Sequence, residues 1–246
     1  MKHPLAPQEP LISFGSTPAQ NALPQTFRLS VWNLHKCTHT DWKKDFSDLC
    51  AQTDLFFVQE MRLSPAVLQT AVQSALHWHA AIGFLSPGGK HPTGVACGAR
   101  AAAENVCFNA QSREPLLRLP KMTLRAVYPI GQTRLLALNL HGINFTGLEA
   151  FKRQLTAAAA LCENWQGPLI AAGDFNAWSQ KRQNEMRRMA QTLGLQEVLF
   201  QPDGRTRYLG KPVDFIFTRG LETLSASVAP LNSSDHRPLS AVLRLP

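Results

Sequence analysis

Polar and ionisable side chains follow short apolar, β-rich runs at many points along this chain of 246 residues. The run DLFFVQ over residues 54–59 leads to Glu60, and the run over residues 133–140 leads to His141. Burying a carboxylate at the end of a strand is costly unless the group is paired or binds a cation. Because the ends of several strands can converge on one cleft, such a chain can assemble a site from distant residues. The residues in this position are Asn33, Glu60, His141, Asp174, Asn176, Asp214, Asp235 and His236.

From Phe27 onward, strand-like runs alternate with segments of helical spacing. Trp42, Phe46 and Cys50 fall on one face of a predicted helix. No linker rich in proline or serine interrupts the chain after Phe27, so we expect a single α/β domain over residues 27–246. The predicted strands are residues 27–33, 54–59, 94–99, 106–109, 123–127, 133–140, 169–172, 213–218 and 240–245.

Three further helix starts are indicated by capping residues. Ser64 precedes a proline, Thr146 and Glu149 fit a capping box, and Ser179 opens a helix that Gly194 ends. Basic residues lie along this last helix, and we interpret them as a solvated face rather than a nucleic-acid contact. They are Lys181, Arg182, Arg187 and Arg188.

Residues 1–26 are expected to form an extended or mobile arm, because prolines stand at positions 4, 7, 10, 18 and 24. The apolar run at residues 11–14 is too short for a secretory signal. No apolar stretch reaches the roughly 18–20 residues of a membrane span. The five cysteines form no CxxC pair, which favours a reducing compartment. We therefore expect a cytoplasmic monomer with no integral membrane association.

The chain also contains a weak internal sequence repeat. Residues 29–35 (LSVWNLH) are similar to residues 135–141 (LLALNLH), and each is followed by a loop, an amphipathic helix and an apolar strand ending in an acid. Two related halves facing each other, or chance similarity between two strands, both account for this pattern.

The available side chains limit the chemistry. The sequence contains no GxxxxGK[ST], GxGxxG, HExxH or GxSxG motif, so several common nucleotide-binding and hydrolytic sites are not supported. Carboxylates, amides and imidazoles without a thiolate form a set of hard ligands, which suits Mg²⁺ or Mn²⁺ better than zinc. The net charge of +8 favours an anionic partner, but charge alone does not choose between nucleic acid, a phosphorylated small molecule and a lipid surface.

Six motifs in fixed order resemble those of the endonuclease/exonuclease/phosphatase superfamily, which includes DNase I. Within it, the helix after GDFNAWS and the segment HGINF are most similar to the bacterial YafD-like proteins. The resemblance covers the chain from about Phe27 to the C-terminus. It implies a four-layer α/β sandwich, with two mixed β-sheets flanked by helices. The motifs are VWNLHK at Asn33, VQEMR at Glu60, NLHG at His141, GDFNAW at Asp174, VDFIF at Asp214 and SSDHRPL at Asp235.

The same resemblance implies a metal site and a phosphate site. Glu60, Asn33 and Asp235 would hold a Mg²⁺ or Mn²⁺ ion, and Asn33 could instead hold the scissile phosphate. Arg62 would contact phosphate, although a surface role fits it nearly as well. A structural salt bridge is the alternative for Glu60, and an Asx-turn is the alternative for Asn33.

The catalytic residues are implied in the same way. Asp174 and Asn176 would position the attacking water and a phosphate oxygen, with an ordinary turn as their alternative. Asp214 would fix the imidazole of His236 in a dyad. His141 would protonate the leaving oxygen or hold the phosphate.

The sequence therefore predicts a divalent-metal-dependent phosphodiesterase, with DNA or RNA as the leading substrate and in-line attack by water as the reaction. One alternative is a phosphoinositide phosphatase or a sphingomyelinase-like phospholipid hydrolase. GDFNAW and SSDHRP stand where the phosphoinositide phosphatases carry other motifs, which argues against that branch. A catalytically inactive nucleic-acid-binding module is the other alternative. Retention of the whole set of acids, amides and imidazoles argues against it.

Overall fold

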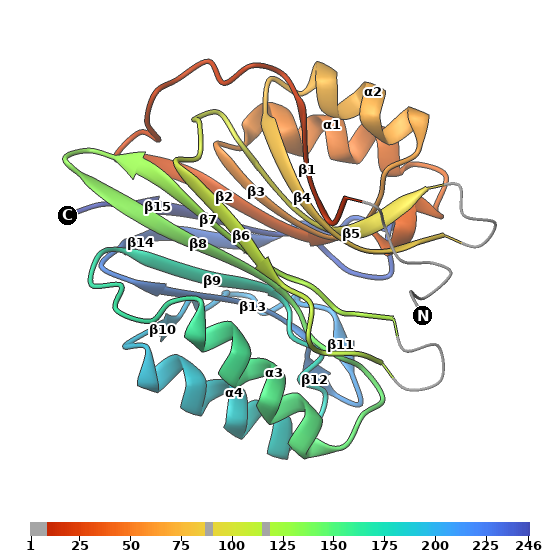
Figure 1. Ribbon diagram of the computed structural model, residues 1–246, viewed down its shortest axis with the longest axis vertical. Helices are drawn as coiled ribbons and strands as arrows, with labels where there is room; N and C mark the ends of the chain where they lie inside the picture. Colours follow the sequence, from red (N-terminus) through yellow and green to blue (C-terminus); the bar gives the residue numbers. More distant parts are fainter. Residues whose placement is uncertain (1–8, 87–90, 115–118) are drawn as a thin grey trace.

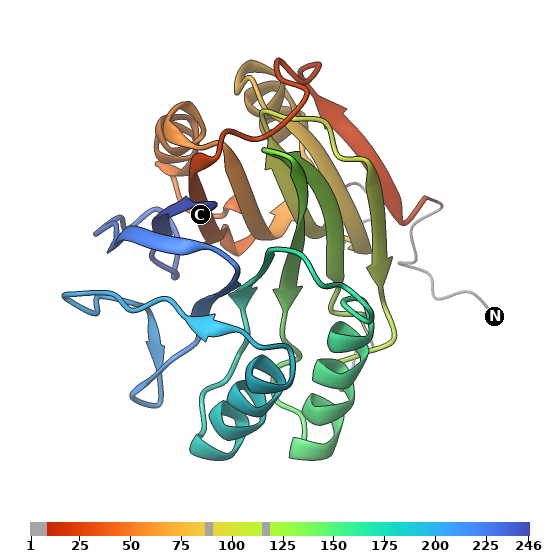
Figure 2. The same cartoon turned by 90° about the vertical axis from the view of Figure 1, so that its left-hand side faces the viewer.

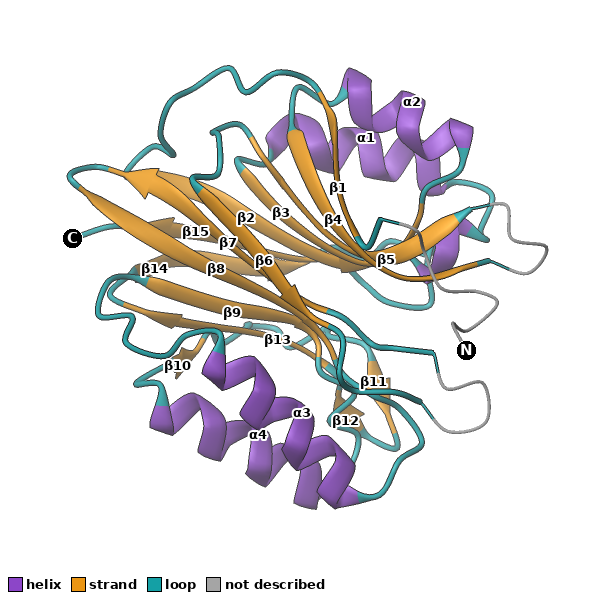
Figure 3. Cartoon of the chain, in the orientation of Figure 1, coloured by secondary structure: helices purple, strands orange, loops and turns teal. Residues whose placement is uncertain are grey.

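The computed structural model describes residues 9–86, 91–114 and 119–246, and its strands form two large sheets packed face to face (Figure 1). Figure 3 shows the helices in two pairs on the outer sides of these sheets. The layers are therefore two helices, a seven-stranded sheet, a six-stranded sheet and two further helices. This arrangement confirms the predicted four-layer α/β sandwich.

The seven-stranded sheet has the order β1-β4-β5-β3-β2-β15-β14. Strands β2 and β3 run parallel, and the other neighbouring strands run antiparallel. The strands span Leu11–Gly15 (β1), Thr26–Asn33 (β2), Leu55–Arg62 (β3), His77–Leu85 (β4), Pro92–Ala99 (β5), Glu222–Val228 (β14) and Leu239–Arg244 (β15).

The six-stranded sheet has the order β10-β13-β9-β8-β7-β6, with β8 and β9 parallel and the other neighbours antiparallel. Its strands span Asn105–Asn109 (β6), Thr123–Ile130 (β7), Thr133–His141 (β8), Leu169–Asp174 (β9), Gln196–Glu197 (β10) and Asp214–Arg219 (β13). A separate hairpin pairs β11 (Arg207–Tyr208) with β12 (Lys211–Pro212).

Helices α1 (Trp42–Gln52) and α2 (Pro65–Gln73) cover the seven-stranded sheet, and α3 (Leu148–Ala160) and α4 (Gln180–Thr192) cover the other (Figure 2). The predicted apolar face of α1 is buried in the structure. Within the described part of the chain, every helix is too short or too polar to cross a lipid bilayer.

Two of the predicted caps are confirmed and one is wrong. The side chains of Ser64 and Ser179 accept hydrogen bonds from the third residue of α2 and α4, respectively. Helix α3 has Gly147 as its N-cap with no side-chain cap, because the Thr146 hydroxyl accepts a hydrogen bond from Arg182 instead. Arg182 is 2% exposed, so the prediction that it lies on a solvated face is also wrong.

The N-terminal segment contributes to the sheet more than the sequence predicted. Residues 11–15 form β1, an edge strand paired antiparallel with β4, and Leu23 lies in the core between the sheets. These residues have the apolar side chains and free backbone groups that an edge position can use. Residues 1–8 of the expected arm lie outside the described residues. The domain boundary at residue 27 stays a prediction.

The two similar segments, residues 29–35 and 135–141, occupy equivalent positions in their sheets. Strand β2 leads through α1 to the parallel strand β3, and β8 leads through α3 to the parallel strand β9. The two β-α-β units lie on facing sheets, with their helices on opposite outer sides (Figure 1). The repeated sequence therefore lies on the first strand of the parallel pair in each sheet.

One buried amide contact joins these centres. Gln59 on β3 donates from Nε2 to Oδ1 of Asn139 on β8 at 2.7 Å. The Asn139 amide group donates to the carbonyls of Val58 and Ala96, at 3.1 and 2.8 Å. Both amide side chains have no exposed surface. Because buried amides are costly without partners, this contact fixes how the two sheets face each other.

We predict that Asn139→Ala lowers the free energy of unfolding by at least about 2 kcal/mol, because it leaves the Gln59 amide and two carbonyls without this partner. Urea denaturation followed by circular dichroism measures the change. The exposed Asn105, whose side chain accepts a hydrogen bond from Arg125, provides the control Asn105→Ala, expected to cost about 0.5 kcal/mol or less. Equal effects of the two substitutions would contradict the role of Asn139.

Candidate active site

The ends of the central strands in both sheets meet at one edge of the sandwich. Strand β8 ends at His141 and β9 ends at Asp174, and these residues pair in register. Strand β13 begins at Asp214, which pairs with Asp174 from the other side. Strand β2 of the facing sheet ends at Asn33, whose Nδ2 donates to Asp174 Oδ2 at 3.1 Å. The fold thus brings together predicted site residues from four strands.

Asp174 is the most highly connected group of the site. Asn176 donates its backbone N–H to Oδ1 at 2.9 Å and its side-chain amide to Oδ2 at 3.0 Å. His141 Nε2 lies 3.4 Å from Oδ2. Burial alone would raise the pKa of Asp174, but the charge of His236 and the hydrogen bonds of His141 and Asn176 outweigh burial and hold this pKa well below its usual range. Asp174 is therefore a carboxylate at neutral pH.

His236 and Asp214 form the predicted pair. His236 Nδ1 lies 2.8 Å from Oδ2 and 3.0 Å from Oδ1 of Asp214. The backbone carbonyl of His236 accepts a hydrogen bond from Trp32 Nε1 at 2.8 Å, which fixes the segment that carries the imidazole. The other ring nitrogen, Nε2, lies 3.9 Å from Asp174 Oδ2. One edge of the ring is thus held by Asp214, and the other faces the Asp174 cluster.

The surrounding carboxylates make His236 a stable cation. Burial alone would lower the pKa of His236, but the negative charges of Asp214 and Asp174 and the hydrogen bond with Asp214 raise it to about 10. An imidazolium carries a proton on both ring nitrogens. His236 Nε2 is therefore a hydrogen-bond donor at neutral pH.

Glu60 enters the site through a distortion of β3. The pairing of β3 with β5 shifts register between Val58 and Met61, and Glu60 has a backbone φ of 52°. This left-handed conformation is unfavourable for a residue with a β-carbon, and a bulge changes the direction of the side chains that follow it. Gln59 can therefore bond Asn139 between the sheets while Glu60 reaches the site.

Two lysines balance the charge of Glu60. Lys36 Nζ donates to Glu60 Oε2 at 2.5 Å, and Lys121 Nζ lies 3.5 Å from Oε1. Lys121 also lies 2.9 Å from His141 Nε2. Burial alone would raise the pKa of Glu60, but Lys121, His141 and Lys36 lower it to about 2. Neither lysine was predicted from the sequence to belong to the site. The sequence feature that could have identified Lys121 is its position as a charged residue just before the apolar residues of β7.

Two predicted residues lie at the margin of this cluster. The Asp235 side chain is 53% exposed, and its Oδ1 lies 3.7 Å from His35 Nδ1. Arg62, two residues beyond Glu60, has a buried Nε with no hydrogen-bond partner. The assigned roles of Asp235 in metal binding and of Arg62 in phosphate binding remain predictions.

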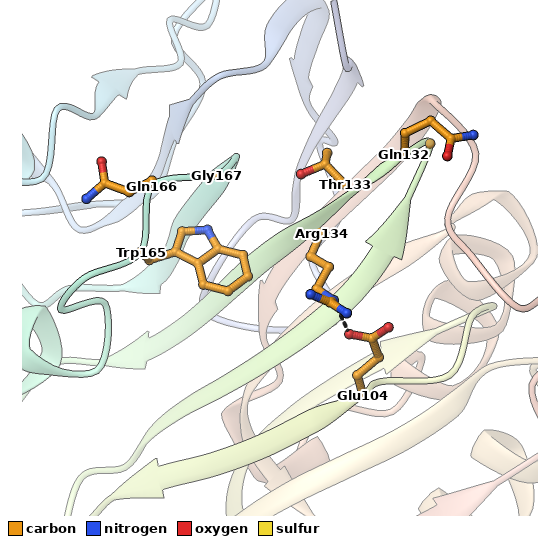
Figure 4. A pocket seen from close by; sticks show the side chains of 8 residues that line it. Glu104, Gln132, Thr133, Arg134, Trp165, Gln166 and Gly167 are labelled. Atoms are coloured by element: carbon orange, nitrogen blue, oxygen red, sulfur yellow. Dashed lines mark ion pairs between the residues drawn. The ribbon is translucent and has the colours of Figure 1, made fainter.

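A cavity of about 370 Å³ opens beside Glu60. Lys36, Lys121 and His141 line its polar side, and Phe84 and Met122 contribute to an apolar wall. A larger but polar hollow of about 500 Å³ lies near the opposite end of β8, around Arg134 and Trp165 (Figure 4). That hollow contains none of the predicted site residues. The cavity beside Glu60 is thus the one that adjoins the chemistry.

Glu60 and Asp174 offer carboxylate oxygens on the same side of the site. Glu60 Oε1 and Asp174 Oδ2 converge on His141 Nε2, at 3.8 and 3.4 Å. Carboxylate oxygens are the ligands that Mg²⁺ and Mn²⁺ prefer. Lys36 is 40% exposed along its side chain, so it can withdraw from Glu60 when another cation takes its place.

A second group of potential ligands is less suitable. Asp174, Asp214 and His236 offer atoms that lie within 4.8 Å of one another. However, His236 Nδ1 already bonds Asp214 at 2.8 Å, so only one nitrogen of this ring faces the remaining space. The geometry therefore favours a histidine–carboxylate dyad at this position.

We predict that His236 retains its proton above about pH 8 and that Asp214→Asn moves its titration to lower pH. Because the folded pKa lies above the ordinary value of 6.5, the stabilisation by this charge is complete below about pH 6.5 and is lost as the pH rises towards 10. ¹⁵N NMR of the imidazole measures the titration. Loss of the proton near pH 6.5 in the unsubstituted protein would contradict the assignment.

Comparisons with known proteins agree with the predicted fold. A UPF0294 protein of Yersinia pseudotuberculosis is 41% identical over 218 residues, which cover 87% of this chain and 82% of that protein. UPF0294 proteins are YafD-like, so these relatives agree with the predicted branch.

Solved structures with low sequence identity share the fold. An endonuclease/exonuclease/phosphatase from Beutenbergia cavernae has a TM-score of 0.69 at 15% identity, covering 89% of this chain and 72% of that one. The 3′ phosphatase NExo from Neisseria, bound to a product DNA hairpin, has a TM-score of 0.62 at 20% identity, covering 87% of this chain and 98% of that one.

A family model matches a range of the chain that includes every predicted site residue. The model described as the endonuclease/exonuclease/phosphatase family matches residues 31–236, a range that begins just before Asn33 and ends at His236. Members of this family are generally hydrolytic phosphoesterases and include nucleases and phosphatases. The chain therefore belongs to the endonuclease/exonuclease/phosphatase family.

Proposed function

We propose that this protein is a divalent-cation-dependent phosphodiesterase that hydrolyses nucleic acid. The observation that carries the proposal is the arrangement of the His236 imidazole, which is 14% exposed, is held at Nδ1 by Asp214, and has Nε2 at 3.9 Å from Asp174 Oδ2. A proton donor and a carboxylate acceptor thus face the same space. Hydrolysis of a phosphodiester needs both a group to orient water and a positive charge beside the phosphoryl oxygens.

In this mechanism, Asp174 accepts a hydrogen bond from the attacking water and orients it in line with the leaving oxygen. Asn176 and Asn33 keep the carboxylate in place through their amide groups. His236 donates from Nε2 to a phosphoryl oxygen, whose negative charge grows in the transition state. Asp214 keeps the imidazole oriented and charged.

On the other side of the site, His141 protonates the leaving oxygen, and Asp174 takes the proton of the attacking water. Lys121 Nζ lies 2.9 Å from His141 Nε2. Glu60 would hold a divalent cation, with Asn33 and Asp235 as further oxygen donors. A cation bound there supplies positive charge to the phosphoryl group. Arg62 and Lys121 would contact the substrate phosphate from the cavity that they line.

Nucleic acid is favoured as the substrate because the chain carries a net charge of +8 and cations border the cavity beside Glu60. The structural relative NExo is a 3′ phosphatase that was solved with DNA. We propose that the protein acts as a monomer in the cytoplasm. Its five cysteines are all free thiols, which suits a reducing compartment.

Phospholipid hydrolysis is the second candidate function. Phe145 and Leu209 are 67% and 71% exposed, and exposed apolar side chains are what an enzyme uses to engage a lipid surface.

A substrate panel tests the proposal. Plasmid DNA, single-stranded DNA, RNA, phosphoinositide vesicles and sphingomyelin vesicles are incubated with Mg²⁺ or Mn²⁺, and products are quantified. We expect cleavage of nucleic acid that EDTA abolishes and that Glu60→Gln reduces by at least about 10²-fold, since the amide lacks the charge that binds the ion.

Glu222→Gln is the matched control, because Glu222 is half-exposed and pairs with Arg244 on the outer strands β14 and β15. It should retain full activity. Activity that persists in EDTA would exclude the cation from the reaction. Hydrolysis of vesicles without cleavage of any nucleic acid would favour the lipid candidate.

We also predict that His236→Ala lowers kcat by at least about 10²-fold, the usual effect of one acid–base or charge-stabilising group. Asp214→Asn should lower it as well, because the amide cannot sustain the charge of the imidazole. Single-turnover rates measure both effects. His77→Ala, on β4, serves as the control. If both dyad variants fold normally and react at the rate of the unsubstituted protein, the dyad takes no part in the reaction.

A further inference from the structure

Three aromatic side chains form a cluster that the proposed catalytic steps do not use. The rings of Phe145 and Tyr208 meet edge to face, with centroids 6.3 Å apart, and those of Trp178 and Tyr208 meet in the same way at 6.3 Å. Phe145 is 67% exposed and Tyr208 is 45% exposed. We call Phe145, Trp178 and Tyr208 the aromatic cluster.

Each member of the aromatic cluster belongs to a loop that leaves the candidate active site. Phe145 follows His141 by four residues, and Trp178 follows Asn176 by two. Tyr208 lies on β11, in the hairpin that immediately precedes β13. The cluster therefore adjoins the place where the scissile phosphate would lie.

A buried arginine joins two of these loops. Arg182 donates from Nη1 to the carbonyls of Ile143 and Asn176, at 2.7 and 3.1 Å. Its Nη2 donates to the backbone and side-chain oxygens of Thr146, at 2.8 and 3.0 Å. The guanidinium also lies over the Trp178 ring, 4.7 Å from its centroid. Because Arg182 is 2% exposed, it fixes the loops after β8 and β9 as one unit.

Asn144 holds two of the aromatic residues directly. Its Oδ1 accepts hydrogen bonds from Trp178 Nε1 and from the backbone N–H of Phe145, both at 2.9 Å. Phe145 has a backbone φ of 50°, a conformation that a bulky aromatic residue rarely adopts. A strained residue persists where its surroundings determine it strongly. The exposed Phe145 ring is therefore presented by an ordered loop.

Cations border the aromatic cluster. Arg237, next to His236, is exposed, and its backbone N–H donates to Thr206 Oγ1 in the segment that leads to the hairpin. Lys211 pairs with Tyr208 across the hairpin, whereas Arg207, the strand neighbour of Tyr208, pairs with Asp203 at 3.0 Å. Exposed rings with cations beside them match a strand of nucleic acid, which offers flat bases and a charged backbone.

We propose that the aromatic cluster binds unpaired bases of a single-stranded nucleic acid next to the bond that is cut. This inference rests on the proposed function and narrows its substrate to single strands or single-stranded regions. Stacking on Tyr208 and Phe145 tolerates any base, because every base has a flat face. Lys211 and Arg237 contact the phosphates between the stacked bases.

A bilayer fits these observations less well. An interfacial anchor presents a broad apolar face to the lipid, whereas the apolar contribution here comes from Phe145, Leu209 and one face of Tyr208. Trp178 has its N–H bonded within the protein and a buried arginine against its ring, so it supports the cluster instead of projecting from it. The arrangement therefore suits flat ligands that lie on the rings.

Fluorescence anisotropy tests the proposal without any reaction, since binding is measured in EDTA. The probes are a labelled single-stranded DNA of about 12 nucleotides and an oligomer of the same length that lacks its bases. The proteins are the unsubstituted chain, Tyr208→Ala, Phe145→Ala and the control Val72→Ala. Val72 is 54% exposed on α2, which covers the other sheet.

We expect Tyr208→Ala and Phe145→Ala each to weaken binding of the DNA by at least about fivefold, and to change binding of the base-free oligomer by less than about twofold. Val72→Ala should leave both affinities unchanged. Equal losses for the two probes would mean that the residues act only through the backbone, and an unchanged affinity for DNA would mean that they do not bind it. Either result overturns the proposal.

Two further measurements separate this inference from the proposed function. Cleavage of the base-free oligomer by the unsubstituted protein in Mg²⁺ or Mn²⁺ reports on the proposed function alone, because it needs no base stacking. If that oligomer and every other phosphodiester resist hydrolysis, the proposed function fails while the binding result still stands. Vesicles of phosphatidylcholine and phosphatidylglycerol form the last probe. If both aromatic variants lose vesicle binding but keep DNA binding, the aromatic cluster binds a membrane surface and not a single strand of nucleic acid.

Discussion

The buried carboxylate of Asp174 is the interaction on which the site depends. A charge with 2% exposure is tolerated inside a protein only where hydrogen bonds and opposite charge compensate for lost water. Asn33 supplies that compensation from the seven-stranded sheet, and Asn176 and His141 supply it from the six-stranded sheet. Any shift between the sheets would break these bonds. Because the buried Asp174 carboxylate needs these hydrogen bonds, strands that are distant in sequence are held in alignment at the site.

The same principle accounts for Glu60. The bulge in β3 and the left-handed backbone at Glu60 place a second carboxylate near His141, where Lys36 and Lys121 neutralise it. Side chains that can move provide this countercharge on one flank, whereas Asp214 and His236 on the other flank form a fixed pair. The site thus has a positive charge from lysines on one flank and from His236 on the other, as the proposed metal-assisted hydrolysis needs.

Much of this architecture could be predicted from the sequence, because strand ends with polar residues and the caps Ser64 and Ser179 are local signals. Other features depend on tertiary contacts. Lys121 was missed because its partners, Glu60 and His141, lie on other strands, and the Thr146 cap failed because Arg182 takes the hydroxyl. Strands β1 and β14 were missed because edge strands are partly exposed and lack a clear alternating pattern.

The position of the divalent cation is tested most directly by diffraction from crystals soaked in Mn²⁺, recorded at a wavelength where manganese scatters anomalously. We expect one strong anomalous peak in contact with Glu60, with Lys36 withdrawn from the carboxylate and the His236–Asp214 hydrogen bond intact. A peak ligated by His236 and Asp214 would contradict it, because the dyad would then be a metal site. Absence of any peak at Glu60, with both lysines still in place, would contradict it as well.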